Sequence, residues 1–194
     1  TGNEDFKVER CRKICHSKQN SCIHSVLRIG RLCRYHFAFY NRGGIRVSGI
    51  PAGDITLKTL LAIEPFSNHI VVQEMTVDDI KQLLLNRFNE LLPTVFDDLF
   101  MGGGTFTIVR DSSGKGIDVL LRNPSGTPLV PNKRYKVALN DYINARYDFP
   151  GKGNGIHSEI SVIETLLTYL SNTLLYKSHT HTPALHVINT RVEL

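Results

Sequence analysis

The residues best suited to chemistry form a short turn at 41–46 (NRGGIR). Two adjacent glycines allow backbone N–H groups to approach a ligand closely, because glycine has no side chain in the way. Arg46 can hold a phosphate through two parallel hydrogen bonds. The turn therefore predicts an anion site. Taken alone, it is more typical of a tight surface turn with an exposed arginine, so its interpretation as an anion site depends on the surrounding sequence.

Further motifs follow this turn in a fixed order. They are 50–56 (IPAGDIT), 64–68 (EPFSN), the glycine loop 102–104, and 137–142 (VALNDY) with Asp148 six residues further on. Together with the turn, these motifs resemble the C-terminal domain family of 5′-nucleotidases over about residues 37–170. The resemblance implies that domain's α+β fold, a mixed sheet with packed helices, and a substrate-recognition role.

The resemblance also implies roles for individual side chains. Phe66 and Tyr142 match two aromatic residues that sandwich a nucleobase, and stacking of this kind contributes ~1–3 kcal/mol per base. Asp148 matches a carboxylate that accepts hydrogen bonds from the ribose hydroxyls. Asn68 matches a residue that contacts the base edge. These four positions predict a nucleoside site.

The phosphate end of the expected site comes from the turn. Asn41, Gly43 and Arg46 match the residues that meet the substrate phosphate, and Gly103 lies in a loop expected to flank the base. The chain departs from the family by having Arg and Tyr at 146–147 where many members have two glycines, and Tyr rather than Phe at 142. The aromatic clamp survives both changes, whereas the ribose contact loses a flexible loop.

Catalysis is not expected from this chain alone. In the family resembled, hydrolysis takes place at a two-metal centre in a separate N-terminal metallophosphoesterase domain, where the metals polarise the phosphate and activate water. Its ligand motifs, such as Asp-x-His and Gly-Asn-His, are absent here, and His69 and His157 stand alone. We therefore expect no cofactor in this chain, a divalent metal pair in the N-terminal partner domain, and a nucleotide or nucleoside as ligand. The alternative is a stand-alone nucleoside-binding module without catalysis.

Composition narrows the function classes further. The 194 residues are 41% hydrophobic and suffice for one domain with a core. The net charge of +5 is concentrated in the first 36 residues, which carry eight Lys and Arg against three Asp and Glu. The positive and negative charges of the remaining residues cancel, which argues against a nucleic-acid-binding surface. No apolar run reaches the ~18 residues of a membrane span. Localisation stays open, although the resemblance implies a periplasmic, cell-surface or secreted protein.

Residues 1–36 form an atypical basic segment. They hold all four cysteines, which allow two disulfides or one zinc site, although no Cys-x-x-Cys pair occurs. No helical or strand period organises residues 9–36. Two hypotheses remain open: a disordered basic extension, or translation out of frame, since codons for 33–36 read one base over can encode the Ala-Asp-Ile that the family has here.

The remaining chain reads as one domain over 37–176 with a polar tail at 177–194. Capping boxes at Thr76-x-x-Asp79 and Ser161-x-x-Glu164 predict two helix starts. A long segment rich in Gly, Asn and Asp, 144–160, predicts an exposed loop. We expect strands at 37–40, 69–75, 105–110, 117–122 and 134–139, and helices at 57–63, 76–91 and 161–175.

Overall fold

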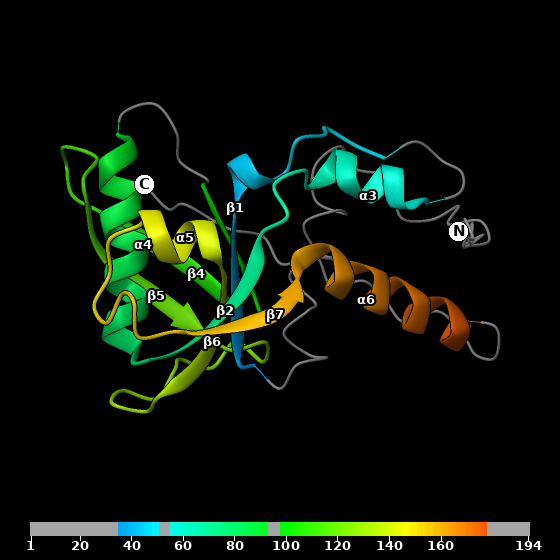
Figure 1. Ribbon diagram of the computed structural model, residues 1–194. Helices are drawn as coiled ribbons and strands as arrows, with labels where there is room; N and C mark the ends of the chain where they lie inside the picture. The colour runs from blue at the N-terminus through cyan, green and yellow to red at the C-terminus, as the bar shows by residue number, and fades with distance from the viewer. Residues whose placement is uncertain (1–34, 51–54, 93–97, 178–194) are drawn as a thin grey trace.

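The computed structural model describes residues 35–50, 55–92 and 98–177 (Figure 1). Five strands form one sheet in which β1 and β6 are parallel and all other neighbours are antiparallel. This confirms the expected α+β fold with a mixed sheet. In spatial order the strands are β3 (Leu99–Gly102), β1 (Phe37–Asn41), β6 (Tyr135–Asn140), β2 (His69–Met75) and β7 (Ile156–Ser161).

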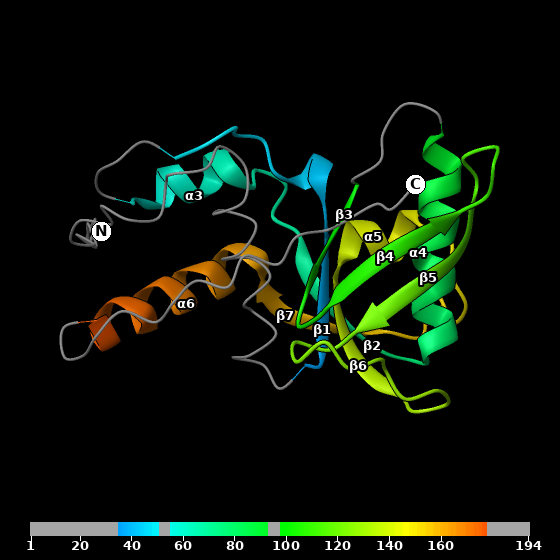
Figure 2. The same ribbon diagram turned by 180° about the vertical axis from the view of Figure 1, so that it is seen from behind.

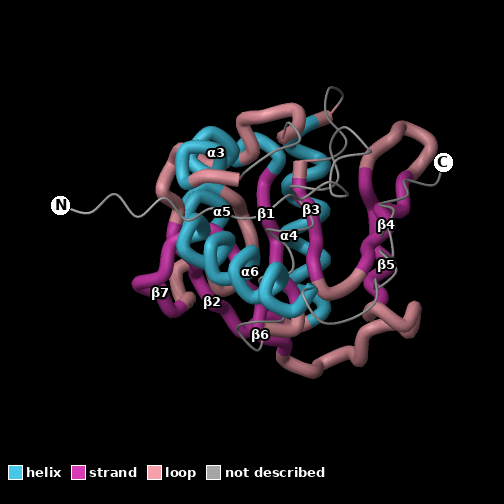
Figure 3. Tube along the Cα trace, turned by 90° about the vertical axis from the view of Figure 1, so that its right-hand side faces the viewer, coloured by secondary structure: helices cyan, strands magenta, loops and turns pink. Residues whose placement is uncertain are grey.

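Both faces of this sheet are covered. One face packs against α4 (Val77–Leu91), α5 (Asp141–Arg146) and the hairpin of β4 (Thr105–Arg110) and β5 (Gly116–Arg122). The other face packs against α3 (Leu57–Ile63) and α6 (Val162–Lys177), as seen in Figures 1 and 2 and face-on in Figure 3.

Coverage on both faces explains the apolar first strand. Phe37 and Phe39 of β1 lie in the core beneath α4, whereas Ala38 and Tyr40 lie in the core beneath α3 and α6. A strand buried on both sides has no polar face, so its sequence reads as a continuous apolar run. At the end of β1 a short 3₁₀ turn, η1 (Arg42–Gly44), carries the chain out of the sheet.

The predicted helix starts are confirmed. The Thr76 hydroxyl accepts a hydrogen bond from the Asp79 backbone N–H at 3.2 Å, and the Asp79 carboxylate accepts one in return from the Thr76 N–H at 2.8 Å. Ser161 and Glu164 make the same reciprocal pair ahead of α6. Each box satisfies two backbone groups that a helix start leaves without partners, which is why these helices begin where they do.

The exposed loop predicted at 144–160 is wrong at both ends. Residues Asp141–Arg146 form α5, and Tyr147 and Phe149 just after it are buried. Residues Ile156–Ser161 form β7, an edge strand whose Ile156 and Ile160 side chains are exposed. Because β7 buries few side chains, its sequence lacks the apolar alternation that indicates a strand.

Most of the basic segment 1–36 and of the tail 177–194 lies outside the described residues, so the hypotheses on both stay predictions. The strand β3 was not anticipated either, and it pairs with the edge of β1. Within the described residues, no helix combines the length and the apolar character needed to cross a membrane.

Candidate functional site

Strand directions bring three motifs to one end of the sheet. Because β1 and β6 are parallel, η1 and α5 both emerge at the end where these strands finish. The strand β2 runs antiparallel to β6 and starts at this end, with Ile70 opposite Asn140. The turn at 41–46, the turn at 64–68 and α5 therefore meet there, toward the top of Figure 1.

Asn41 anchors the first turn from below. Its side chain is buried, and its Oδ1 accepts a hydrogen bond of 2.8 Å from the Asn140 Nδ2. The Asn140 Oδ1 in turn accepts a 2.9 Å bond from the Ile143 N–H and so caps α5. One asparagine pair thus ties the predicted phosphate turn to the helix that carries Tyr142.

The turn itself has no room for larger residues at its second glycine. A Cβ on Gly44 would lie 2.7 Å from the Tyr40 ring. Arg46 is exposed, and its backbone N–H donates to the Ile63 carbonyl at the end of α3 at 2.9 Å. The turn is therefore held from both sides while its arginine side chain stays available to solvent.

Phe66 forms an exposed aromatic platform beside this turn. Its side chain is 54% exposed, and the Arg46 guanidinium carbon lies over the ring at 5.8 Å from the centroid. Ser67, which follows, has a φ of 53°, a left-handed conformation that favours glycine. The turn thus adopts an unfavourable backbone conformation while it presents Phe66 outward, where core packing cannot account for it.

Asn68 is buried and held by an acid that sequence reasoning missed. Its Nδ2 donates to the Glu64 Oε1 at 2.5 Å. Glu64 is completely buried, and its second carboxylate oxygen has no hydrogen-bond partner among the described residues. The Tyr40 hydroxyl lies in the same cluster, within reach of Glu64, Asn68 and Asn140.

Burial in this cluster shifts the pKa values of Glu64 and Tyr40. Burial raises the pKa of Glu64 above its ordinary value, and the hydrogen bonds from Asn68 offset only part of the rise. Burial, then the Glu64 charge, raises the pKa of Tyr40. Tyr40 therefore stays protonated and acts as a hydrogen-bond donor beneath the site.

Tyr142 lies on α5 with 46% of its side chain exposed. The edge of the Tyr147 ring supports it, with centroids 6.1 Å apart and planes at 76°. The Tyr147 hydroxyl donates to Asp98, and the Arg87 guanidinium stacks over the Tyr147 ring at 4.4 Å. A chain of contacts thus fixes the second exposed aromatic residue from behind.

Asp98 is the centre of that brace, and the sequence offers no motif that could have revealed it. Its carboxylate accepts a 2.6 Å bond from the Arg87 Nε, and its backbone oxygen accepts one from the Arg42 N–H in η1. Burial lowers the pKa of Arg87, but hydrogen bonds to Asp98 and Glu90 outweigh this, so that the pKa is raised overall. The pair is firmly ionic.

Asp148 lies just beyond α5, where Asn86 of α4 donates from its Nδ2 to both the Asp148 carbonyl at 3.1 Å and its carboxylate at 3.3 Å. The carboxylate stays exposed and can accept further bonds. Where many members of the family have two glycines, this loop is held in place by two contacts. Tyr147 packs inward, and Asn86 binds Asp148.

Gly103 is not brought together with the other predicted residues. It lies in the turn between β3 and β4, with a φ of 85°, beside His36 at the start of β1. The candidate site lies at the other end of β1, about 13 Å away at the rise of a β-strand. A Cβ at Gly103 would clash with the His36 carbonyl oxygen, which gives this glycine a structural role.

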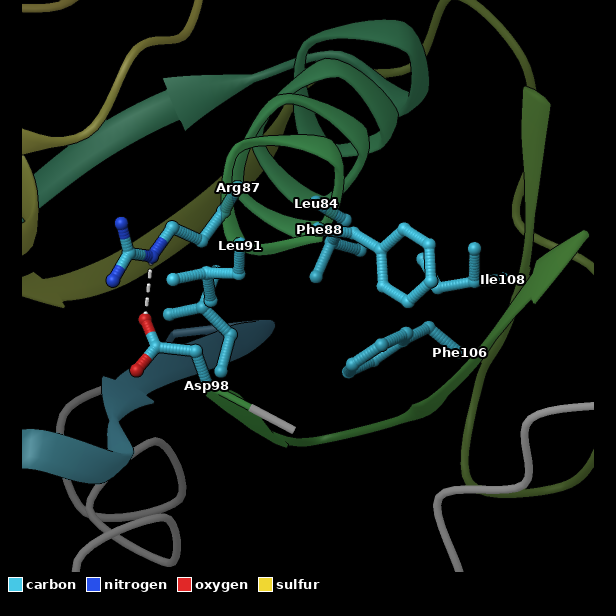
Figure 4. Close-up of a pocket in the computed structure, with 8 residues that line it drawn as sticks. Leu84, Arg87, Phe88, Leu91, Asp98, Phe106 and Ile108 are labelled. Atoms are coloured by element: carbon cyan, nitrogen blue, oxygen red, sulfur yellow. Dashed lines mark hydrogen bonds and ion pairs between the residues drawn. The ribbon is translucent and has the colours of Figure 1, made fainter. Parts of the chain in front are cut away.

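A separate pocket lies between α4 and the strands β3 and β4 (Figure 4). Its polar lining consists of Arg87 and Asp98, which are paired with each other, so it offers no free charge to a ligand. No cluster of three or more His, Cys, Asp or Glu side chains suited to a metal ion occurs in the parts of the chain that the structure describes.

Comparisons with known proteins agree with this fold. The family model of the 5′-nucleotidase C-terminal domain matches residues 8–149, a range that includes the whole of the segment 9–36. The trifunctional nucleotide phosphoesterase YfkN of Bacillus subtilis is 31% identical over 141 residues, covering 66% of this chain and 9% of that protein. The protein UshA of Yersinia enterocolitica is 34% identical over 106 residues, covering 55% of this chain and 18% of that protein.

Solved structures show the same fold. The 5′-nucleotidase precursor of Thermus thermophilus superimposes with a TM-score of 0.61 at 22% identity, over 77% of this chain and 32% of that one. A putative 5′-nucleotidase from Staphylococcus aureus gives 0.62 at 14% identity, over 97% and 40%. The chain thus spans a small part of these proteins, and it belongs to the 5′-nucleotidase C-terminal domain family.

Proposed function

We propose that this domain binds the nucleoside part of a nucleotide between Phe66 and Tyr142, and the phosphate at the turn that carries Arg46. The observation that supports this most is the pair of exposed aromatic side chains at one end of the sheet, next to a glycine-containing turn with a solvent-exposed arginine. Every nucleobase has a π-face, so such a platform accepts purines and pyrimidines alike.

The buried polar cluster supports the proposal from below. Asn68 is oriented by Glu64, and Asn41 is oriented by Asn140, so both amides are fixed before a ligand arrives. Fixed polar groups lose little conformational entropy on binding, which favours affinity. Asp148 extends the same surface with an exposed carboxylate suited to a pair of ribose hydroxyls.

Hydrolysis is proposed only for a longer protein. The chain covers 9% and 18% of the two bacterial relatives, so a catalytic domain outside it is the natural source of the reaction. In our proposal this domain holds the nucleoside and presents the phosphate to an N-terminal metallophosphoesterase domain. That domain would hold the two metal ions, which would supply polarisation of the phosphate and activation of water.

The experiment is a calorimetric titration of the 194-residue chain with adenosine and AMP, repeated with Phe66→Ala and Tyr142→Ala. Losing one stack is expected to weaken binding about five- to 150-fold. Ile117→Ala is the matched control, since Ile117 on β5 is 56% exposed and belongs to none of the motifs of the candidate site. Equal affinities for all four proteins would refute the aromatic clamp.

A further inference from the structure

The Arg46 guanidinium is tied to two parts of the candidate site at once. Its Nη1 donates to the Gly43 carbonyl at 3.4 Å, and its Cζ lies 5.8 Å from the Phe66 ring centroid. The backbone N–H of Arg46 is fixed on Ile63 at 2.9 Å, which holds the root of the side chain in place. The guanidinium thus bridges the phosphate turn and the aromatic platform.

This position closes one face of the platform. A base that stacks on Phe66 lies with its atoms about 3.5–4 Å above the ring, the optimal separation of carbon atoms. The Arg46 Cζ lies 5.8 Å from the ring centroid, so its height above the ring is no greater than this, and it would lie at most about 2 Å beyond the plane of such a base, inside contact distance. A base can therefore use this face only if Arg46 moves away.

We infer that Arg46 is a specificity-determining residue that covers one face of Phe66 until a phosphate draws it off, so that the site favours nucleoside monophosphates over nucleosides. The inference rests on the proposed function, because it assumes that Phe66 stacks a base. A phosphate group offers Arg46 charge-assisted bidentate hydrogen bonds, which are stronger than an exposed cation–π contact. A nucleoside has to displace the guanidinium without offering this replacement.

The consequence is an inverted response of the two ligands to one substitution. Arg46→Ala removes the competitor for the ring face, so adenosine affinity rises about two- to fivefold, the equivalent of an exposed cation–π contact. The same change removes the phosphate partner, so AMP affinity falls about tenfold or more. A reaction product without phosphate would likewise be expelled as Arg46 returns.

The test uses the full chain in a Phe66→Trp background. The sequence contains no tryptophan, so this change places a single tryptophan at the platform, and its emission reports stacking. Adenosine and AMP are titrated with and without Arg46→Ala and Arg46→Gln. Lys58→Ala, which removes the same charge from an exposed position on α3, is the control and is expected to leave the ratio of the two affinities unchanged.

A rise in adenosine affinity together with a fall in AMP affinity supports the inference. An unchanged or lowered adenosine affinity overturns it, because the base then uses the open face of Phe66 and the proposed function stands. Failure of both ligands to bind the parent chain, or binding that Phe66→Ala leaves intact, refutes the proposed function itself and the inference with it.

Discussion

Replacing Asn140 by alanine tests how the site is held together. Asn140 is buried with 2% exposure and makes two side-chain bonds with different partners. Its Nδ2 donates to Asn41 below the phosphate turn, and its Oδ1 accepts from the Ile143 N–H to cap α5. Asn140→Ala removes both, and it leaves the Asn41 Oδ1 buried without this donor.

The magnitude follows from these two losses. An N-cap contributes about 1 kcal/mol, and a buried acceptor left without its donor costs about 1–3 kcal/mol. Asn140→Ala should therefore lower the free energy of unfolding by about 2–4 kcal/mol, a large share of the roughly 5–15 kcal/mol typical of a domain. AMP affinity should fall as well, because the turn is no longer tied to α5.

Urea denaturation at constant temperature measures this change, with unchanged m-values showing that the unfolded states are comparable. Asn140→Ser separates the two losses, since serine caps a helix but is too short to reach Asn41. We expect Asn140→Ser to be destabilised by the buried-acceptor cost alone. A loss of less than about 1 kcal/mol for Asn140→Ala would refute the reasoning, because the cap alone accounts for that much.

Three further predictions concern the surroundings of the site. A raised pKa means that the folded chain binds the Glu64 proton more tightly than the unfolded chain does, so protonated Glu64 stabilises the fold. This stabilisation is fully present below the unfolded pKa, and it is lost as pH rises through the folded pKa. Thermal melts at stepped pH should therefore show wild-type stability declining above about pH 4.5, and Glu64→Gln should flatten this decline. Gly103→Ala should destabilise the chain in urea by more than Gly126→Ala, because both glycines have a positive φ but only a Cβ at Gly103 would meet backbone atoms. AMP affinity should be unchanged in Gly103→Ala, and a selective loss of AMP affinity would instead place Gly103 in the site. Asp98→Asn should lower the free energy of unfolding in urea by about 1.5–3 kcal/mol and weaken AMP binding. Asp118→Asn, which breaks a more exposed ion pair, should lower it by less than about 1 kcal/mol. Equal losses would contradict the role of Asp98 in holding Tyr147 and Arg87.

Local signals in the sequence predicted most of the fold. Capping boxes depend on residues three positions apart, so Thr76 and Ser161 mark their helices without knowledge of the rest. The strand β7 was not predicted because an edge strand buries few side chains and shows no apolar period. The strand β3 escaped because a four-residue element carries almost no pattern of its own.

The residues of the candidate site also fall into those that local motifs predict and those that depend on the three-dimensional fold. Phe66 and Tyr142 were predicted through motif resemblance, and the strand register supplies the reason that their segments meet. Glu64 and Asp98 could not be predicted, because their partners lie on other elements and depend on the three-dimensional fold. Gly103 was assigned to the base by resemblance alone, and only the sheet register shows that it lies at the far end of β1.

The central claim is that one end of the sheet, formed by the turns at 41–46 and 64–68 and by α5, binds a nucleotide. Its most direct test is a ¹H–¹⁵N correlation titration of the labelled chain with AMP. We predict saturable shifts of the backbone amides of Gly43, Phe66, Asn68 and Tyr142, with Gly103 and the β4–β5 hairpin unmoved. Shifts centred on Gly103 or the hairpin, or no saturable shifts in a well-folded spectrum, would contradict the account.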